Sequence, residues 1–250
     1  MIALMMLALA AADNYPDPAQ LIQKAIAARQ AQNAKGWKYT WREEVEMRDE
    51  KSRPLKPFQR TFDVIMPEGE NYRKLVLIDG QPLDDAMKKK VEQDMEKERA
   101  LRRKHEFMNK VVPFGGLEDL ERLFDNKVVG EQGMWGRKAW KVLSEPKKGV
   151  KAANGKEEEI LATRRGTWFD EEEGVEVRQT TYYVRGIHGI KALSFDTIEW
   201  GKVGDAWLPS TNRFRSEVSP VPGFRNFGDA SYRYFDYKRF SADATLIPEQ

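Results

Sequence analysis

The sequence predicts an α+β fold, a strongly curved antiparallel β half-barrel whose concave face is covered by an N-terminal helix and a two-helix insertion. Two observations lead to this prediction. Apolar residues recur at helical spacing after residue 17 and again over about 83–125, whereas most of the remaining chain alternates apolar and polar residues between turns. A curved sheet that folds around helices buries both kinds of apolar face.

The composition bounds the domain count and the chemistry. A chain of 250 residues can bury a sizeable core, and because no tract resembles an interdomain linker we expect a single domain over residues 13–250. The net charge of +2 provides no global field that would attract nucleic acid. The absence of cysteine excludes disulfides and thiol nucleophiles, and two histidines are too few for a multi-histidine metal site. We therefore expect no catalysis, no metal and no cofactor.

The first twelve residues form the apolar run MIALMMLALAAA, which is too short to span a bilayer as a helix. Ala10 and Ala12 fit the small-residue cleavage pattern of a secretory signal, although the usual positive segment is missing. We expect residues 1–12 to be a signal-peptide remnant and the protein to reach the periplasm or cell envelope. A buried N-terminal helix is the alternative.

Three helices are expected. Asp17 as N-cap and Pro18 at the first helical position begin the first helix, which Gly36 ends. The second runs from Leu83 to about Phe107, with one thin apolar stripe beneath dense charge, and the third covers residues 116–124. The apolar spacing of the first helix is carried by Leu21, Ile22, Ala25, Ile26 and Arg29.

The remaining chain is predicted to be strands and turns. Exposed turns are expected at 149–156, 171–174 and 219–223, where Gly, Pro and charge combine. Asp125–Asn126 is expected to break the third helix before the later strands begin. Strands are expected at 37–42, 58–66, 72–78, 128–129, 139–143, 160–161, 167–169, 175–184, 195–200, 207–218 and 232–240.

Acidic clusters are the abundant candidates for acid–base or metal chemistry, and each has a structural interpretation that we prefer. Asp79–Gly80 is expected to end a strand, with Pro82 setting the turn into the long helix. Asp84–Asp85 would stabilise the N-terminus of that helix through its dipole. The run Glu171–Glu173 is expected at a solvated hairpin tip.

The two histidines and the basic residues of the long helix are expected at the surface. His105 and His188 accompany no G-x-S-x-G or related nucleophile motif. An enzyme that uses Asp79, Asp170 or His188 is the least favoured hypothesis. Lysines and arginines of the long helix alternate with acids, which favours a solvated face over a phosphate- or membrane-binding one.

Aromatic and apolar residues on the predicted strands and on the long helix are the candidate lining of a ligand cavity. They are numerous enough to build a large apolar face, and a curved sheet whose helices cover it loosely would leave a pocket there. The candidates are Trp37, Tyr39, Trp41, Leu75, Leu77, Met87, Val91, Trp140, Trp168, Tyr183 and Trp200.

Several short motifs resemble a known family. Gly166–Asp170 followed by Gly174–Arg178 resembles a strand pair of the outer-membrane lipoprotein-sorting carriers (LolA/LolB-like), and Trp207–Ser210 resembles their Leu-Pro strand. Tyr72 to Leu83 is similar to a branch of secreted bacterial proteins in which an Arg-rich strand ends at Asn/Asp-Gly-x-Pro-Leu. The resemblance implies a half-barrel capped by helices that carries a lipid. The charged segment 83–107 departs from the typical carrier.

Two functions follow from these observations as hypotheses. The first is an exported, non-enzymatic protein that binds a lipid or lipoprotein acyl chain in the concave sheet, with peripheral membrane contact and no binding of nucleic acid. The second is an envelope scaffold or sensor that contacts a partner protein through its long charged helix and fills the barrel with its own side chains.

Overall fold

The computed structural model describes residues 15–35, 38–49, 51–65, 72–103, 116–187, 190–218 and 226–240. The expected signal segment, Trp37, His105, His188 and the turn at 219–223 lie outside these ranges. The elements are, in chain order, α1 (Pro18–Ala34), β1 (Lys38–Arg48), β2 (Pro54–Ile65), β3 (Tyr72–Ile78), β4 (Gln81–Pro82), α2 (Asp85–Arg103), α3 (Leu117–Leu123), β5 (Phe124–Met134), β6 (Arg137–Pro146), α4 (Gly155–Ile160), β7 (Thr163–Asp170), β8 (Glu176–Tyr183), β9 (Phe195–Val203), β10 (Ala206–Val218) and β11 (Asn226–Phe240).

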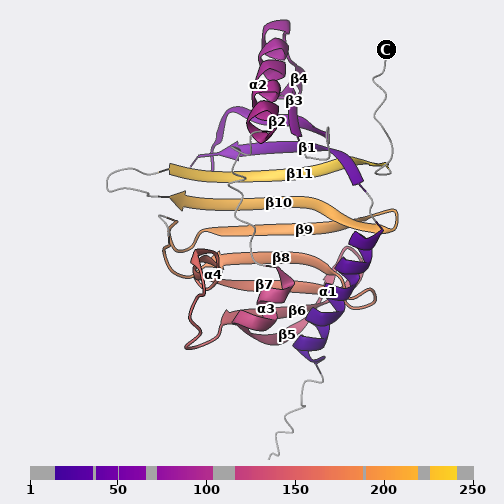
Figure 1. Cartoon of the computed structure of the whole chain (residues 1–250), viewed down its shortest axis with the longest axis vertical. Coiled ribbons are helices and arrows are strands. Elements are labelled where there is room, and N and C mark those ends of the chain that lie inside the picture. Colours follow the sequence, from indigo (N-terminus) through magenta and orange to yellow (C-terminus); the bar gives the residue numbers. More distant parts are fainter. Residues whose placement is uncertain are drawn as a thin grey trace, which may run out of the picture.

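The described strands form one 11-stranded antiparallel sheet in the order β4-β3-β2-β1-β11-β10-β9-β8-β7-β6-β5. The sheet is curved and open, and with its helices it confirms the predicted α+β half-barrel (Figure 1). Neighbours in the sheet are consecutive in the chain except at the pairing of β1 with β11, where Val45 lies opposite Tyr232. This pairing joins the early meander β1–β4 to the later meander β5–β11.

Two helices cover one end of the sheet. Asp17 caps α1 by accepting a hydrogen bond from the Ala19 amide (3.0 Å), as predicted. In Figure 1, α1 and α3 lie across β5–β8. We call the covered face, which presents Val142 and Phe169, the helix face, and the opposite face, which presents Trp168, the open face. Burial of such side chains stabilises by about 1.5–3 kcal/mol each. The core here contains Leu21, Ile22, Ala25, Ile26, Leu117, Leu120, Leu123, Phe124, Val128, Val142, Ile160 and Phe169.

The long charged helix α2 lies at the other end of the sheet, beside β3 (Figure 1). Asp84 caps it, because its Oδ1 accepts a hydrogen bond from the Met87 amide (2.8 Å). Met87 and Leu101 are exposed on this helix. In the described part of the chain, no helix has the length and apolar character needed to cross a membrane.

The structure corrects the predicted elbow after β3. Ile78 pairs with Gln81, so Asp79 and Gly80 form a two-residue hairpin loop in which both have positive φ (48° and 75°). Pro82 therefore belongs to the short strand β4 and does not set the turn into α2. The Asp79 carboxylate is structural, since its Oδ1 accepts a hydrogen bond from the Gln59 amide (2.8 Å).

Two further predictions about element boundaries were wrong. The strand expected at residues 160–161 is the end of α4, which Asn154 caps by accepting a hydrogen bond from the Glu157 amide (3.0 Å). Glu157 in turn accepts from the Ala153 amide (2.8 Å), so that reciprocal capping stabilises this short helix. Asp125–Asn126 does not form a break, because β5 begins at Phe124 directly after α3.

Candidate functional site

A pocket of about 370 Å³ lies between α1 and the helix face at β8–β10. Aromatic and aliphatic side chains form much of its wall, and a few polar groups converge on it, which is the usual composition of a small-molecule site. Its lining residues are Ala25, Ala28, Arg29, Gln32, Asn33, Leu117, Val175, Glu176, Trp200, Trp207, Leu208 and Pro209.

Local geometry explains why these residues meet. Ala25, Arg29 and Gln32 are spaced so that one side of α1 presents all three, and the small alanine leaves room above the sheet. On β9, alternation sends Trp200 to the helix face, where it lies opposite Pro209 of β10.

The C-terminal half of α1 is fixed to the sheet by Gln32. Its side-chain amide donates to the Trp207 carbonyl (3.0 Å) and accepts from the Trp207 amide (2.9 Å). This pair satisfies both backbone groups of Trp207 at a position where β10 borders the helix. One wall of the pocket is therefore held by hydrogen bonds as well as by apolar packing.

The principal charged group in the pocket is Glu176. Its side chain is only 4% exposed and forms an ion pair with Arg29 through Oε2. A bulge places Trp168 opposite Arg178 but Phe169 opposite Glu176, so Glu176 lies beside Phe169 on the helix face. Burial raises the pKa of the Glu176 carboxyl to about 7, although the charges of Arg29 and Arg165 act to lower it.

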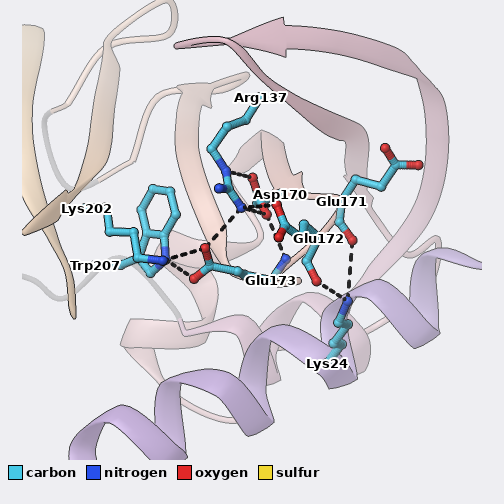
Figure 2. Close-up of polar contacts among 8 residues, drawn as sticks. All are labelled: Lys24, Arg137, Asp170, Glu171, Glu172, Glu173, Lys202 and Trp207. Carbon is cyan, nitrogen blue, oxygen red and sulfur yellow. Dashed lines mark hydrogen bonds and ion pairs between the residues drawn. The ribbon is translucent and has the colours of Figure 1, made fainter. Parts of the chain in front are cut away.

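A second charged cluster lies at the β7–β8 turn and contacts Trp207, which lines the pocket (Figure 2). Arg137 donates to both carboxylate oxygens of Asp170 (2.6 and 2.8 Å) and also to Glu173 (3.0 Å). Glu173 further accepts from Lys202 (2.8 Å) and from the indole of Trp207 (2.9 Å). This cluster orients Trp207, a wall residue of the pocket.

The pKa values of the cluster agree with fully ionised pairs. Burial acts to raise the pKa of Asp170, but hydrogen bonds from Arg137 and from backbone amides outweigh it, so that the pKa lies below its usual value. Hydrogen bonds from Lys202 and Trp207 likewise lower the pKa of Glu173. The Asp170 hydrogen bond raises the pKa of Arg137. These groups are suited to holding structure and not to proton transfer near neutral pH.

Lys24 of α1 contacts the same β7–β8 turn. Its ammonium donates to the carbonyls of Glu171 (3.4 Å) and Glu172 (3.2 Å), as Figure 2 shows. Gly174 makes this approach possible, because it has φ of 67° and a Cβ there would lie 2.2 Å from Cδ of Lys24.

The prediction of a solvated tip at Glu171–Glu173 thus needs a correction. Glu171 and Glu172 are exposed, but Glu173 is partly buried within the cluster because Arg137, Lys202 and Trp207 surround it. Across the described ranges, no group of three or more His, Asp or Glu side chains is arranged to hold a metal ion.

The structure places few of the predicted cavity residues at this pocket. Trp200 lines it. Tyr39 and Trp41 are not among its lining residues, but both contact the ring of Tyr237, whose hydroxyl donates to the carbonyl of the lining residue Pro209 (2.6 Å).

The other predicted cavity residues lie elsewhere. Trp140 packs on the core beneath α1 and contacts Tyr15, and Trp168 lies on the open face between Lys141 and Arg178. The Tyr183 hydroxyl donates to Glu159 (2.7 Å). Leu75 and Leu77 belong to β3, and Met87 and Val91 belong to α2.

Sequence reasoning missed the polar residues of the site. Arg29 had a visible signal, since it occupies the apolar stripe of the first helix where a charge needs a buried partner. Glu176 had none, because the bulge that turns it toward α1 depends on the register between two strands. Gln32 lies just beyond the apolar spacing and was not singled out.

A larger hollow of about 530 Å³ lies on the open face. Its charges are largely paired, with Arg178 to Glu199 at 2.6 Å and Arg233 to Glu44 at 3.0 Å. Thr197, Thr211 and Ser231 complete a mainly polar lining beside the rings of Phe195 and Tyr232. Its chemistry is that of a solvated sheet face.

Comparison with solved structures finds proteins to which the chain is similar at low sequence identity. It is similar to a DUF1329 family protein from Desulfovibrio piger (13% identity, TM-score 0.44, 92% of this chain and 96% of that chain). It is similar to a LolA superfamily protein from Nitrosomonas europaea (8% identity, TM-score 0.39, 92% of this chain and 96% of that chain). It is also similar to an outer membrane lipoprotein-sorting protein domain from Vibrio parahaemolyticus (11% identity, TM-score 0.40, 90% of this chain and 95% of that chain). No family model and no curated protein matches the chain.

Proposed function

We propose that this protein binds a small hydrophobic ligand, a lipid or a lipoprotein acyl chain, in the pocket beneath α1, and that it does so without catalysis. The observation that carries the proposal is the pocket itself, with Trp200, Trp207 and Leu208 as its apolar wall and Glu176 as a polar group at one side. A site of this composition can bury an apolar body and orient one polar end.

The size of the pocket favours a single chain. At about 370 Å³ it lies near the lower end of the range for small-molecule sites, roughly 300–1,000 Å³. Several acyl chains together would require α1 to move away from β10, at the expense of the Gln32–Trp207 hydrogen bonds.

The absence of catalysis is proposed from the described titratable groups. Asp170 and Glu173 are engaged by Arg137 and Lys202, and Asp79 holds a hairpin on another part of the sheet. Glu176 is the one of these carboxylates that lines the pocket, and no second acid or base among the pocket-lining residues accompanies it except Arg29. We further propose, from the signal-like N-terminal run, that the protein acts in the periplasm or cell envelope.

The proposal is tested with the purified protein and two measurements. Native mass spectrometry after purification without detergent should show a lipid adduct. Titration with diphenylhexatriene, an apolar dye that fluoresces when it leaves water, should give a saturable signal with one site per chain. A dye signal that rises linearly without saturation, together with a mass spectrum free of adducts, would exclude the pocket as a ligand site.

A second candidate function is contact with an envelope protein through α2. The observation that favours it is the position of α2 at the end of the sheet remote from the pocket, with Met87 and Leu101 exposed on a charged helix. Photocrosslinking from position 101 in cells should then give one discrete adduct, whereas the exposed Val129 of β5 serves as a control position. Equal crosslinking from both positions would remove this candidate.

A further inference from the structure

We infer that the ligand of the pocket carries a neutral hydrogen-bond donor, a hydroxyl or an amide N–H, that binds Oε1 of Glu176. This inference rests on the proposed function and specifies the chemical class of its ligand. It distinguishes long-chain alcohols and amides from free fatty acids and from plain hydrocarbons.

The two carboxylate oxygens of Glu176 differ in their hydrogen-bond partners. Oε2 accepts from the guanidinium of Arg29. Oε1 is buried, and no protein atom in the described ranges donates to it. A buried carboxylate oxygen without a donor is costly, so a group that supplies one hydrogen bond is bound favourably at this position.

The location of this oxygen distinguishes it from other buried acceptors. The carboxylate of Asp229 is also buried without a donor among the described residues, but it belongs to β11 and lines none of the described pockets. Glu176 lines the pocket together with Trp207 and Leu208, so a ligand whose apolar body contacts these two side chains lies beside Glu176.

The charges around the pocket select the charge of the polar end. A fatty-acid carboxylate would be repelled by Glu176, although Arg29 would attract it. An ammonium group would be attracted by Glu176 and repelled by Arg29 and by the nearby buried Arg165. A neutral donor avoids both conflicts and leaves the existing ion pair intact.

The test uses the full chain at pH 8 and displacement of diphenylhexatriene by three ligands of equal chain length. These are 1-decanol, decyl methyl ether and decanoate. Because a hydrogen bond to a charged acceptor is lost in the ether, decanol should displace the dye at about tenfold lower concentration than decyl methyl ether. Decanoate should be weaker than decanol.

The outcomes separate the two proposals. If alcohol and ether displace the dye equally well, the hydrogen bond to Glu176 is excluded although the hydrophobic site stands. If none of the three displaces the dye, the proposed function fails, and this inference fails with it. Tighter binding of decanoate than of decanol would also overturn the inference, in favour of recognition by Arg29.

A variant tests the role of the residue directly. Glu176→Leu removes the acceptor and leaves Arg29, whose side chain is 43% exposed, in contact with water. The variant should bind alcohol and ether with equal affinity, and the affinity for the ether should not fall. Retention of the tenfold preference in a folded variant would overturn the inference. Should the variant not fold, the wild-type comparison of the three ligands decides.

Discussion

The pocket beneath α1 and the open-face hollow differ in chemistry more than in size. The open-face hollow is the larger, at about 530 Å³, but its arginines and carboxylates are largely paired with one another. The pocket beneath α1, at about 370 Å³, combines tryptophan rings with a buried carboxylate that is satisfied on one oxygen only. Volume alone therefore does not distinguish a binding site from a solvated hollow, whereas the hydrogen-bond partners of the polar groups in the wall do.

The contrast arises from strand alternation. Glu199 and Trp200 are neighbours in β9, yet the first faces the open side, where it pairs with Arg178, and the second lines the pocket. The helix α1 covers one face and leaves the Glu176 side chain only 4% exposed, and this burial strengthens the electrostatic interactions of its carboxylate. On the open face, the ion pairs Arg178–Glu199 and Arg233–Glu44 remain partly solvated and therefore contribute little to stability.

Removal of one arginine from each region should give the largest difference. Arg137→Ala leaves Asp170, whose side chain is 2% exposed, without its bidentate partner and should lower the free energy of unfolding by about 3 kcal/mol. Arg233→Ala breaks a pair whose arginine is 60% exposed, and the loss should stay below about 1 kcal/mol. Urea denaturation measures both, and equal losses would contradict the distinction between the two regions.

A smaller effect is expected from the raised pKa of Glu176. The folded protein keeps a proton on Glu176 up to about pH 7, whereas the unfolded chain releases it near the usual value of 4.5. The stability that this group contributes is therefore full below pH 4.5 and declines as the pH rises through about 7. From pH 5 to 8, the free energy of unfolding of Glu176→Gln should rise by about 2 kcal/mol relative to wild type.

Glu173→Gln provides the opposite sign as a control. Lys202 and Trp207 hold the pKa of Glu173 below its usual value, so its contribution is present above pH 4.5 and is lost as the pH falls through the lowered pKa. The variant should therefore approach the stability of wild type in acid. Parallel pH profiles for the two variants would show that the carboxylates do not differ in environment.

The smallest effect concerns the hydrogen bonds that fix α1. Gln32→Ala removes two bonds to the backbone of Trp207 and should cost about 1–2 kcal/mol. Gln23→Ala, on the same helix, removes an exposed contact to Glu121 and should cost less than about 0.5 kcal/mol. Chemical denaturation with circular dichroism detects the difference, and identical midpoints would mean that Gln32 does not hold the helix.

Local signals in the sequence predicted much of the fold. The start of α1 followed from Asp17 and Pro18, and the bounds of β3 agreed with the predicted strand 72–78. Two elements, the hairpin after β3 and the helix α4, were predicted wrongly although the sequence carries a local signal for each. Asp79–Gly80 is a typical two-residue hairpin pair, and Asn154 with Glu157 is a capping pair for α4.

The site was harder to predict because its assembly is not local. Trp168 and Trp200 both come from strands, but register shifts and the position of α1 decide that only Trp200 lines the pocket. In the sequence Glu176 resembles any strand residue, and only the bulge beside Phe169 places it on the helix face. Contacts between distant segments, such as Arg29 with Glu176, require the folded sheet, because the position of Arg29 indicates that it needs a partner but nothing in the sequence identifies that partner.

The most direct test of the central claim is a diphenylhexatriene titration of the wild type and of two variants that each fill one hollow. Ala28→Trp places a ring in the pocket beneath α1, and Thr211→Trp places one in the open-face hollow. We expect Thr211→Trp to bind the dye as the wild type does, whereas Ala28→Trp, if circular dichroism shows it to be folded, should have a dissociation constant for the dye raised by about tenfold or more. Unchanged binding by Ala28→Trp, or loss of binding in Thr211→Trp, would contradict the central claim.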